Sequence, residues 1–188
     1  MRPVYRYLAT AITSAILIST GGCSSRDIVD PNKLCRMGAG LAARITGAPQ
    51  PIEICVANSE TDAQFIAVPT PHYEVSGVFT TSDSTTISLV VIFAVHPNIP
   101  VELDITSDLA AAMANPDGVF FGYRETAPPA QDTVSTAVTG RFTLTFSDDS
   151  IAVATFDGLT ITLEDAASPG TIVGTRTISE GFLNVSAD

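Results

Sequence analysis

The sequence predicts a mainly β fold, an antiparallel β-sandwich of about 8–10 short strands with one short helix. Three observations support this class: apolar and polar residues alternate along many short segments, these segments are rich in Val, Ile, Thr and Phe, and Gly, Pro, Asn and Asp separate them. The clearest segment is RFTLTFS, residues 141–147, in which Phe142, Leu144 and Phe146 alternate with polar side chains. This period of two indicates a half-buried strand.

Further strands are expected by the same criteria. They comprise residues 73–80, 86–95, 101–104, 118–124, 151–156, 159–164, 172–178 and 182–186. Segment 86–95 ends in VVIFAV, which is apolar on both faces. It therefore predicts a central strand that is covered on each side.

Residues 38–46, GAGLAARIT, fit two structures. Their alternating apolar residues favour a strand, which a turn at 47–50 would join to a second arm, PIEICVAN. A helix capped by Asp30 competes for the same residues. We favour the strand because each glycine of the segment weakens a helix by about 1 kcal/mol.

Three short polar segments predict turns between strands: Asp148-Asp149, Asp157-Gly158 and Ser179-Glu180-Gly181. The last two are typical of tight hairpins, in which Gly adopts the positive φ that the turn needs. With these turns in place, both faces of the C-terminal strands are partly apolar. Either a strand crosses between two packed sheets, or a β-bulge resets the register.

One short helix is expected after residue 106. Ser107 is its predicted N-cap, Asp108 lies near the positive end of the helix, and Asn115-Pro116 ends it. Leu109 and Met113 fall on one side of it.

The chain of 188 residues is long enough for one domain with a substantial core. We divide it into a signal segment at 1–22, a tether at 23–31 and a β domain at 32–188. Both Arg2 and Arg6 precede Cys23, so a chain beginning at Cys23 has seven basic and twenty acidic residues, a net charge of −13. Nucleic acid and anionic lipid headgroups repel such a surface, and we therefore expect no nucleic-acid partner.

The N-terminus has the layout of a secretory signal. Two arginines precede a run of mostly apolar residues at 8–18, and small residues follow it. The run is too short for a membrane span, which needs about 20 apolar residues.

The residues Thr20-Gly21-Gly22-Cys23 resemble the lipobox of bacterial lipoproteins, although Thr20 replaces the preferred Leu. The resemblance implies cleavage before Cys23 and acyl chains on its thiol and amine. These chains would anchor the protein to a membrane without help from surface charge. In Gram-negative lipoproteins an Asp after the cysteine favours the inner membrane, so Ser24 implies the outer membrane. The tether would place the body near the bilayer, with the periplasmic or cell-surface side left open.

Two further cysteines, Cys35 and Cys55, form an even pair in an oxidising compartment. A disulfide between them is the preferred interpretation, and two separate buried thiols are the alternative. Such a bond would close a loop of some twenty residues and contribute about 3 kcal/mol.

The tail of the chain, from Gly140-Arg141-Phe142 to Phe182-Leu183-Asn184-Val185, resembles the ends of small all-β lipoproteins of uncharacterised function. That group implies no catalytic residues for this chain.

The sequence contains no standard catalytic or nucleotide-binding motif. Its two histidines, His72 and His96, lie beside prolines in expected loops, and a metal site would need a carboxylate such as Glu74 alongside both. We therefore predict no catalytic, metal or cofactor site.

The expected function is that of a lipid-anchored, non-catalytic module that binds or supports another envelope component. Two alternatives remain open: a small envelope enzyme with a spatially assembled carboxylate site, and a carrier of apolar ligands.

Overall fold

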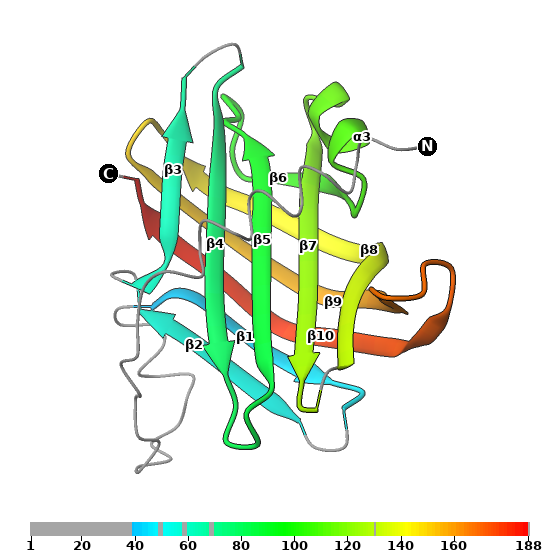
Figure 1. Cartoon of the computed structure of the whole chain (residues 1–188). Coiled ribbons are helices and arrows are strands. Elements are labelled where there is room, and N and C mark those ends of the chain that lie inside the picture. Colours follow the sequence, from blue (N-terminus) through cyan, green and yellow to red (C-terminus); the bar gives the residue numbers. More distant parts are fainter. Residues whose placement is uncertain (1–38, 49–50, 58–59, 68–69, 130, 188) are drawn as a thin grey trace.

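The computed structural model describes residues 39–48, 51–57, 60–67, 70–129 and 131–187. Within them the chain forms ten strands and one short helix (Figure 1). The strands are β1 (Ala39–Thr46), β2 (Ile52–Ala57), β3 (Asp62–Ile66), β4 (His72–Thr80), β5 (Thr86–Ala94), β6 (Val101–Thr106), β7 (Gly118–Ala127), β8 (Gln131–Ser147), β9 (Ile151–Asp165) and β10 (Ile172–Ser186). The helix, α3, spans Leu109–Ala114.

All ten strands belong to one open sheet, in the order β2-β1-β10-β9-β8-β6-β7-β5-β4-β3. Every pairing is antiparallel except that of β6 with β7. The mainly β, mostly antiparallel class is therefore confirmed. The expectation of short strands throughout is wrong, because β8, β9 and β10 have 17, 15 and 15 residues.

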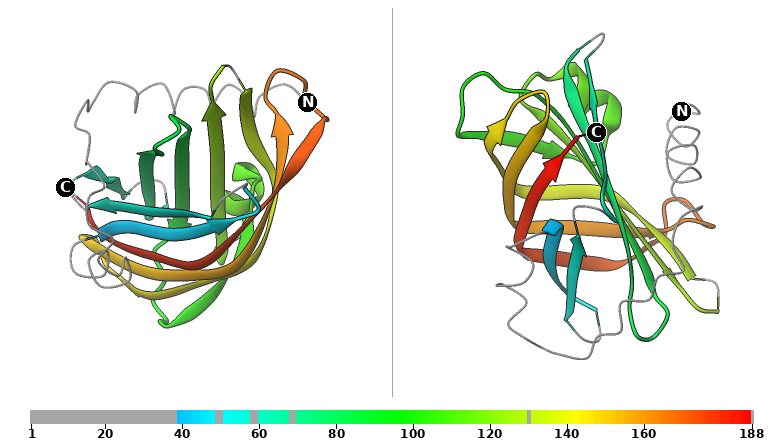
Figure 2. Two further views of the ribbon diagram at one scale, coloured as in Figure 1. Left: turned by 90° about the horizontal axis from the view of Figure 1, so that it is seen from below. Right: turned by 90° about the vertical axis from the view of Figure 1, so that its left-hand side faces the viewer.

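The sheet curls over so that its two halves face each other (Figures 1 and 2). One half contains β2, β1, β10 and β9, and the other contains β7, β5, β4 and β3. Strand β8 joins them, because it pairs with β9 along most of its length and with both β6 and β7 on its other edge. The layers are thus two parts of one sheet.

A chain of aromatic rings occupies the space between the two layers. Successive ring centroids lie 5.6 to 6.1 Å apart along Phe65, Tyr73, Phe93, Phe142, Phe156 and Phe121. Phe142 and Phe156 are stacked, with an interplanar angle of 3°. Burial of these rings contributes strongly to the stability of the core, because each removes a large apolar area from water.

The two hairpins expected at Asp157-Gly158 and Ser179–Gly181 do not exist. Strand β9 runs through the first and β10 through the second. Each of these strands instead has one extra residue at this level. Thr139 and Arg141 of β8 pair with Thr160 and Asp157 of β9. In the same way, Ala42 and Arg44 of β1 pair with Phe182 and Ser179 of β10. The alternative of a bulge that resets the register is therefore the correct one.

The two bulges lie side by side, which explains the change of apolar face. Between β9 and β10 the register stays constant, from Ile178 opposite Leu159 to Gly181 opposite Phe156. Both strands therefore shift together relative to β8 and β1. Gly158 has a φ of 61° and Glu180 a φ of 63°, as bulge residues often do. Inward-facing residues then continue on the same side of the sheet.

The strand interpretation of residues 38–46 is confirmed, since they form β1 from Ala39, paired with β2 as the second arm. The competing helix is wrong for this segment. Strand β3 is not predicted by the sequence. It is short and lies at the sheet edge, where it pairs only with β4.

The central position of β5 is confirmed. So is the helix, including its end at Asn115, with a correction to its N-cap. β5 lies between β4 and β7, and Ile92 packs under α3 with Ala112 and Phe120. The N-cap is Asp108, whose carboxylate accepts from the amides of Ala110 and Ala111. The predicted cap Ser107 instead donates to the carbonyl of Thr136. Leu109 packs against the group that contains Ile92, whereas Met113 is 47% exposed.

Candidate functional site

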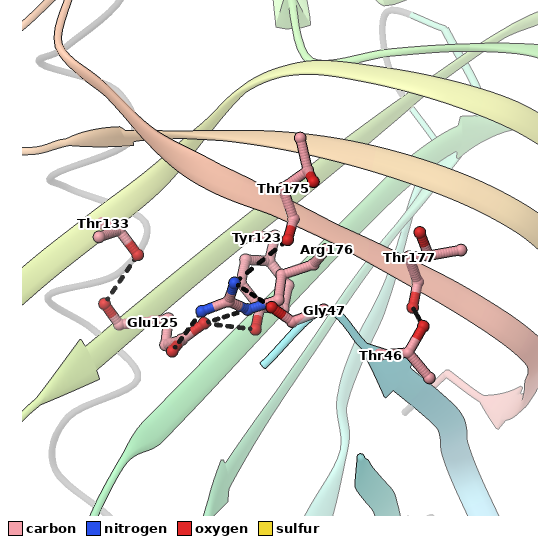
Figure 3. A network of polar contacts seen from close by, with 8 residues as sticks. All are labelled: Thr46, Gly47, Tyr123, Glu125, Thr133, Thr175, Arg176 and Thr177. Carbon is pink, nitrogen blue, oxygen red and sulfur yellow. Dashed lines mark hydrogen bonds and ion pairs between the residues drawn. The ribbon is translucent and has the colours of Figure 1, made fainter. Parts of the chain in front are cut away.

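The strongest cluster of charged groups between the layers joins Glu125 of β7 to Arg176 of β10 (Figure 3). The guanidinium donates from Nε to Oε2 and from Nη2 to Oε1 of the carboxylate, each at 3.0 Å. This two-point geometry is the strongest arrangement of a carboxylate and an arginine. The side chains are 14% and 15% exposed, so solvent screens their charges little.

Tyr123 of β7 completes the cluster from the core side. Its hydroxyl donates to Oε2 of Glu125 at 3.0 Å. Burial, and then the negative charge of Glu125, raise the pKa of Tyr123 far above its ordinary range. The hydroxyl therefore stays protonated and serves as a hydrogen-bond donor to the carboxylate.

Arg176 also ties down the end of β1. Its Nη1 donates to the carbonyl oxygens of Gly47 at 3.0 Å and of Thr175 at 3.1 Å. Gly47 has a φ of 92°, and a Cβ there would lie 2.7 Å from the Thr175 oxygen, so only glycine fits this approach. Burial opposes the charged form of Arg176, but the hydrogen bonds and charge of Glu125 outweigh it and raise its pKa. This permanent cation links β7, β10 and the end of β1.

A small pocket lies beside the cluster. Its volume is about 50 Å³, and it is lined by Glu125, Ala127, Gln131, Thr133, Leu163, Val173 and Arg176. Pockets for small organic ligands measure roughly 300 Å³ or more, so this one accommodates only a few water molecules. Glu125 is the one carboxylate in its lining, and both of its oxygens are engaged by Arg176 and Tyr123. The cluster therefore acts as a clamp between the layers.

A second polar contact crosses the core at Tyr73 of β4. Its hydroxyl donates to the backbone carbonyl of Asp148 at 2.9 Å, in the turn between β8 and β9. The carboxylate of Asp148 caps that turn by accepting from the amides of Ser150 and Ile151, and these bonds lower its pKa. Burial, followed by the charges of Asp148 and Asp149, raises the pKa of Tyr73 to about 12.

Alkaline titration is expected to show no phenolate signal near pH 10, the ordinary pKa of an exposed tyrosine. Tyr5 and Tyr7 precede Cys23, so a chain beginning at Cys23 has only Tyr73 and Tyr123. Folding raises the pKa of both tyrosines. The stability that the two protonated hydroxyls contribute is therefore complete below about pH 10 and is lost as the pH rises through about 12. Ultraviolet absorbance and circular dichroism should therefore report phenolate formation and unfolding together. A tyrosine that titrates near pH 10 in the folded protein would contradict this expectation.

The two histidines do not form a shared site. His72 is buried, and its Nε2 lies 3.3 Å from Oε1 of Glu74, while its Nδ1 lies 2.7 Å from the carbonyl of Thr70. The Nε2 of His96 lies 2.8 Å from Oδ1 of Asp117. Each imidazole thus has its own carboxylate partner. No group of three or more His, Cys, Asp or Glu side chains within the described residues has metal-binding geometry.

The cysteine predictions fall partly outside the described residues. Cys23 and Cys35 both lie outside the described residues. The lipidation of Cys23 and the disulfide between Cys35 and Cys55 therefore stay predictions. Cys55 is an exposed residue of β2, and it lies opposite Ala42 of β1. In the described part of the chain, no helix has the length and apolarity that crossing a membrane requires.

The clamp was missed in the sequence, although a signal for it exists. Arg176 lies two residues before the buried Ile178, and Glu125 lies two residues after the buried Tyr123. The period of two therefore puts both charges on inward faces, where an unpaired charge is costly. That cost predicts a partner of opposite sign for each residue, but it cannot identify which one without the topology.

Comparison with protein-family models, with curated proteins and with solved structures finds no match to this chain.

Proposed function

We propose that the chain is a lipid-anchored protein of the cell envelope, held in the outer membrane by acyl chains on Cys23. Its β domain, with two layers packed as in a sandwich, has a non-catalytic binding or supporting role toward another envelope component. The observation that carries the proposal is the lipobox at Thr20–Cys23 behind a run too short to span a bilayer.

The geometry of the polar clusters supports a non-catalytic role. In the clamp, Glu125 is held by Arg176 and Tyr123, and in the β8–β9 turn Asp148 accepts from its own backbone. A general acid or base must instead reach a substrate proton with an available oxygen. These carboxylates are engaged in holding strands together.

The packing between the layers also favours this role over that of an apolar-ligand carrier. A carrier would hold its ligand between the layers, in a cavity of several hundred Å³. Here the aromatic chain from Phe65 to Phe121 occupies that space, with rings in contact at about 6 Å or less.

Mass spectrometry of the protein from a Gram-negative host tests the anchor. The N-terminal peptide is expected to begin at Cys23 and to carry the mass of a diacylglyceryl group, with or without a further acyl chain. Cys23→Ser should stay uncleaved and lack this mass, whereas the matched Cys55→Ser variant should keep it. A Cys23→Ser protein that is still processed and membrane-bound would refute the proposal.

A further inference from the structure

The outward face of the strands β1, β10, β9 and β8 contains a region without charged side chains. We call it the uncharged face and define it by Ala42, Phe182, Thr155, Val153, Phe146 and Ile151. The register makes these residues neighbours: Ala42 lies opposite Phe182, Phe182 opposite Thr155, and Val153 opposite Phe146. The residues that alternate with them, such as Leu183, Ala154 and Leu144, are buried in the core. The six side chains therefore point away from the core.

Large apolar side chains on this face are accessible to solvent. Phe146 is 42% exposed and Ile151 is 40% exposed, and Phe182 and Val153 are partly exposed. The outward positions between them are occupied by Thr, Ser and Asn. Aromatic and aliphatic groups mixed with hydroxyls suit the interface between lipid headgroups and acyl chains.

Charged residues border this region on two sides. Along the line of the bulges lie Asp157, Glu180 and two exposed pairs, Arg141–Glu102 and Arg44–Glu53. At the opposite end is the turn that contains Asp148 and Asp149. The six side chains of the face include no carboxylate, and the carboxylate of Asp148 at its end already accepts from the amides of Ser150 and Ile151. Contact of the six side chains with lipid therefore desolvates no carboxylate of the face itself.

We propose that the uncharged face lies against the surface of the bilayer that holds the anchor. This inference rests on the proposed lipidation of Cys23. Charge decides the orientation, because the acidic surfaces of the body are repelled by anionic headgroups while this face is not. Chain connectivity is consistent with it, since residues 24–38 link Cys23 to β1, whose Ala42 belongs to the face. That link spans at most roughly 50 Å even when fully extended.

The test uses tryptophan as a reporter, since the native chain has none. Phe146→Trp places the reporter on the uncharged face, and Ile151→Trp repeats the measurement at a second position. Val78→Trp is the matched control: Val78 is 45% exposed and lies on β4, in the other half of the sheet. Each acylated, full-length mature protein is reconstituted into vesicles of phosphatidylethanolamine and phosphatidylglycerol with brominated acyl chains, which quench tryptophan that enters the interface.

The expected result is that brominated lipid quenches the reporter of Phe146→Trp and Ile151→Trp about twofold or more, with a blue shift, and leaves Val78→Trp unchanged. Equal quenching at both faces, or none in protein that floats with the vesicles, would overturn the inference while leaving the anchor intact. A blue shift that depends on protein concentration without vesicles would assign the face to a second copy instead. Failure to float at all would refute the anchor, and the orientation with it.

Discussion

Replacement of Gly181 by alanine is expected to lower the free energy of unfolding by about 3 kcal/mol, because the new methyl group would overlap a buried ring. A Cβ at Gly181 would lie 1.9 Å from the Phe156 ring, well inside contact distance. Phe156 cannot move away freely, because it is stacked on Phe142 at 6.1 Å and lies within the core. Either the ring or strand β10 must shift.

Gly174→Ala provides the matched control within the same strand. Its added methyl group would come no closer than 3.8 Å to Nη1 of Arg176, which is ordinary contact. Urea unfolding followed by circular dichroism should show a change below about 1 kcal/mol for this variant. The double variant Gly181→Ala with Phe156→Leu should be less destabilised than the sum of its single changes, because the smaller side chain leaves room. Equal stability of Gly181→Ala and Gly174→Ala would show that the ring does not depend on a glycine opposite it.

This glycine also illustrates how far the sequence could predict the fold. Alternation identified the strand regions around Phe142 and Leu144 and the strand from Thr86, because apolar side chains must reach one core. The motifs Asp157-Gly158 and Glu180-Gly181 were misassigned as turns. The residue with positive φ is Gly158 in the first motif and Glu180 in the second. Such a residue suits a hairpin turn and a bulge equally well, so local chemistry cannot separate the two. The pairing of β9 with β10 through both segments decides it, and that pairing is long-range.

The missed strand and the displaced helix cap have local causes. β3, DAQFI, is short and polar at alternate positions, and it is ordered by its pairing with β4 alone. At α3, both Ser107 and Asp108 are good caps. The hydroxyl of Ser107 donates to the Thr136 carbonyl of β8, so Asp108 serves as the N-cap of the helix. Contacts made by distant strands therefore decide between two local options.

The single largest effect among the charged residues is expected for Arg176→Met. The variant keeps most of the side-chain volume but leaves the Glu125 carboxylate, 14% exposed, without its counter-charge. Loss of one partner from a buried pair costs about 3 kcal/mol or more. The change also frees the carbonyl of Gly47, which Arg176 holds at 3.0 Å. Thermal and urea unfolding should both show the loss.

A matched pair on the surface shows whether burial is the reason. Arg141 and Glu102 form an ion pair at 3.2 Å, but their side chains are 69% and 63% exposed. Arg141→Met should therefore change stability by only about 0.5 kcal/mol or less, because solvent screens the pair. In the clamp, adding Glu125→Gln to Arg176→Met should restore about 1 kcal/mol or more, since it removes the unpaired charge and leaves Tyr123 an acceptor. If Arg176→Met and Arg141→Met were equally stable, the clamp would not hold the two halves of the curled sheet together. Packing of the aromatic core would then be the interaction that holds the two halves together. The Gly181→Ala variant tests that packing independently, because it perturbs the ring of Phe156.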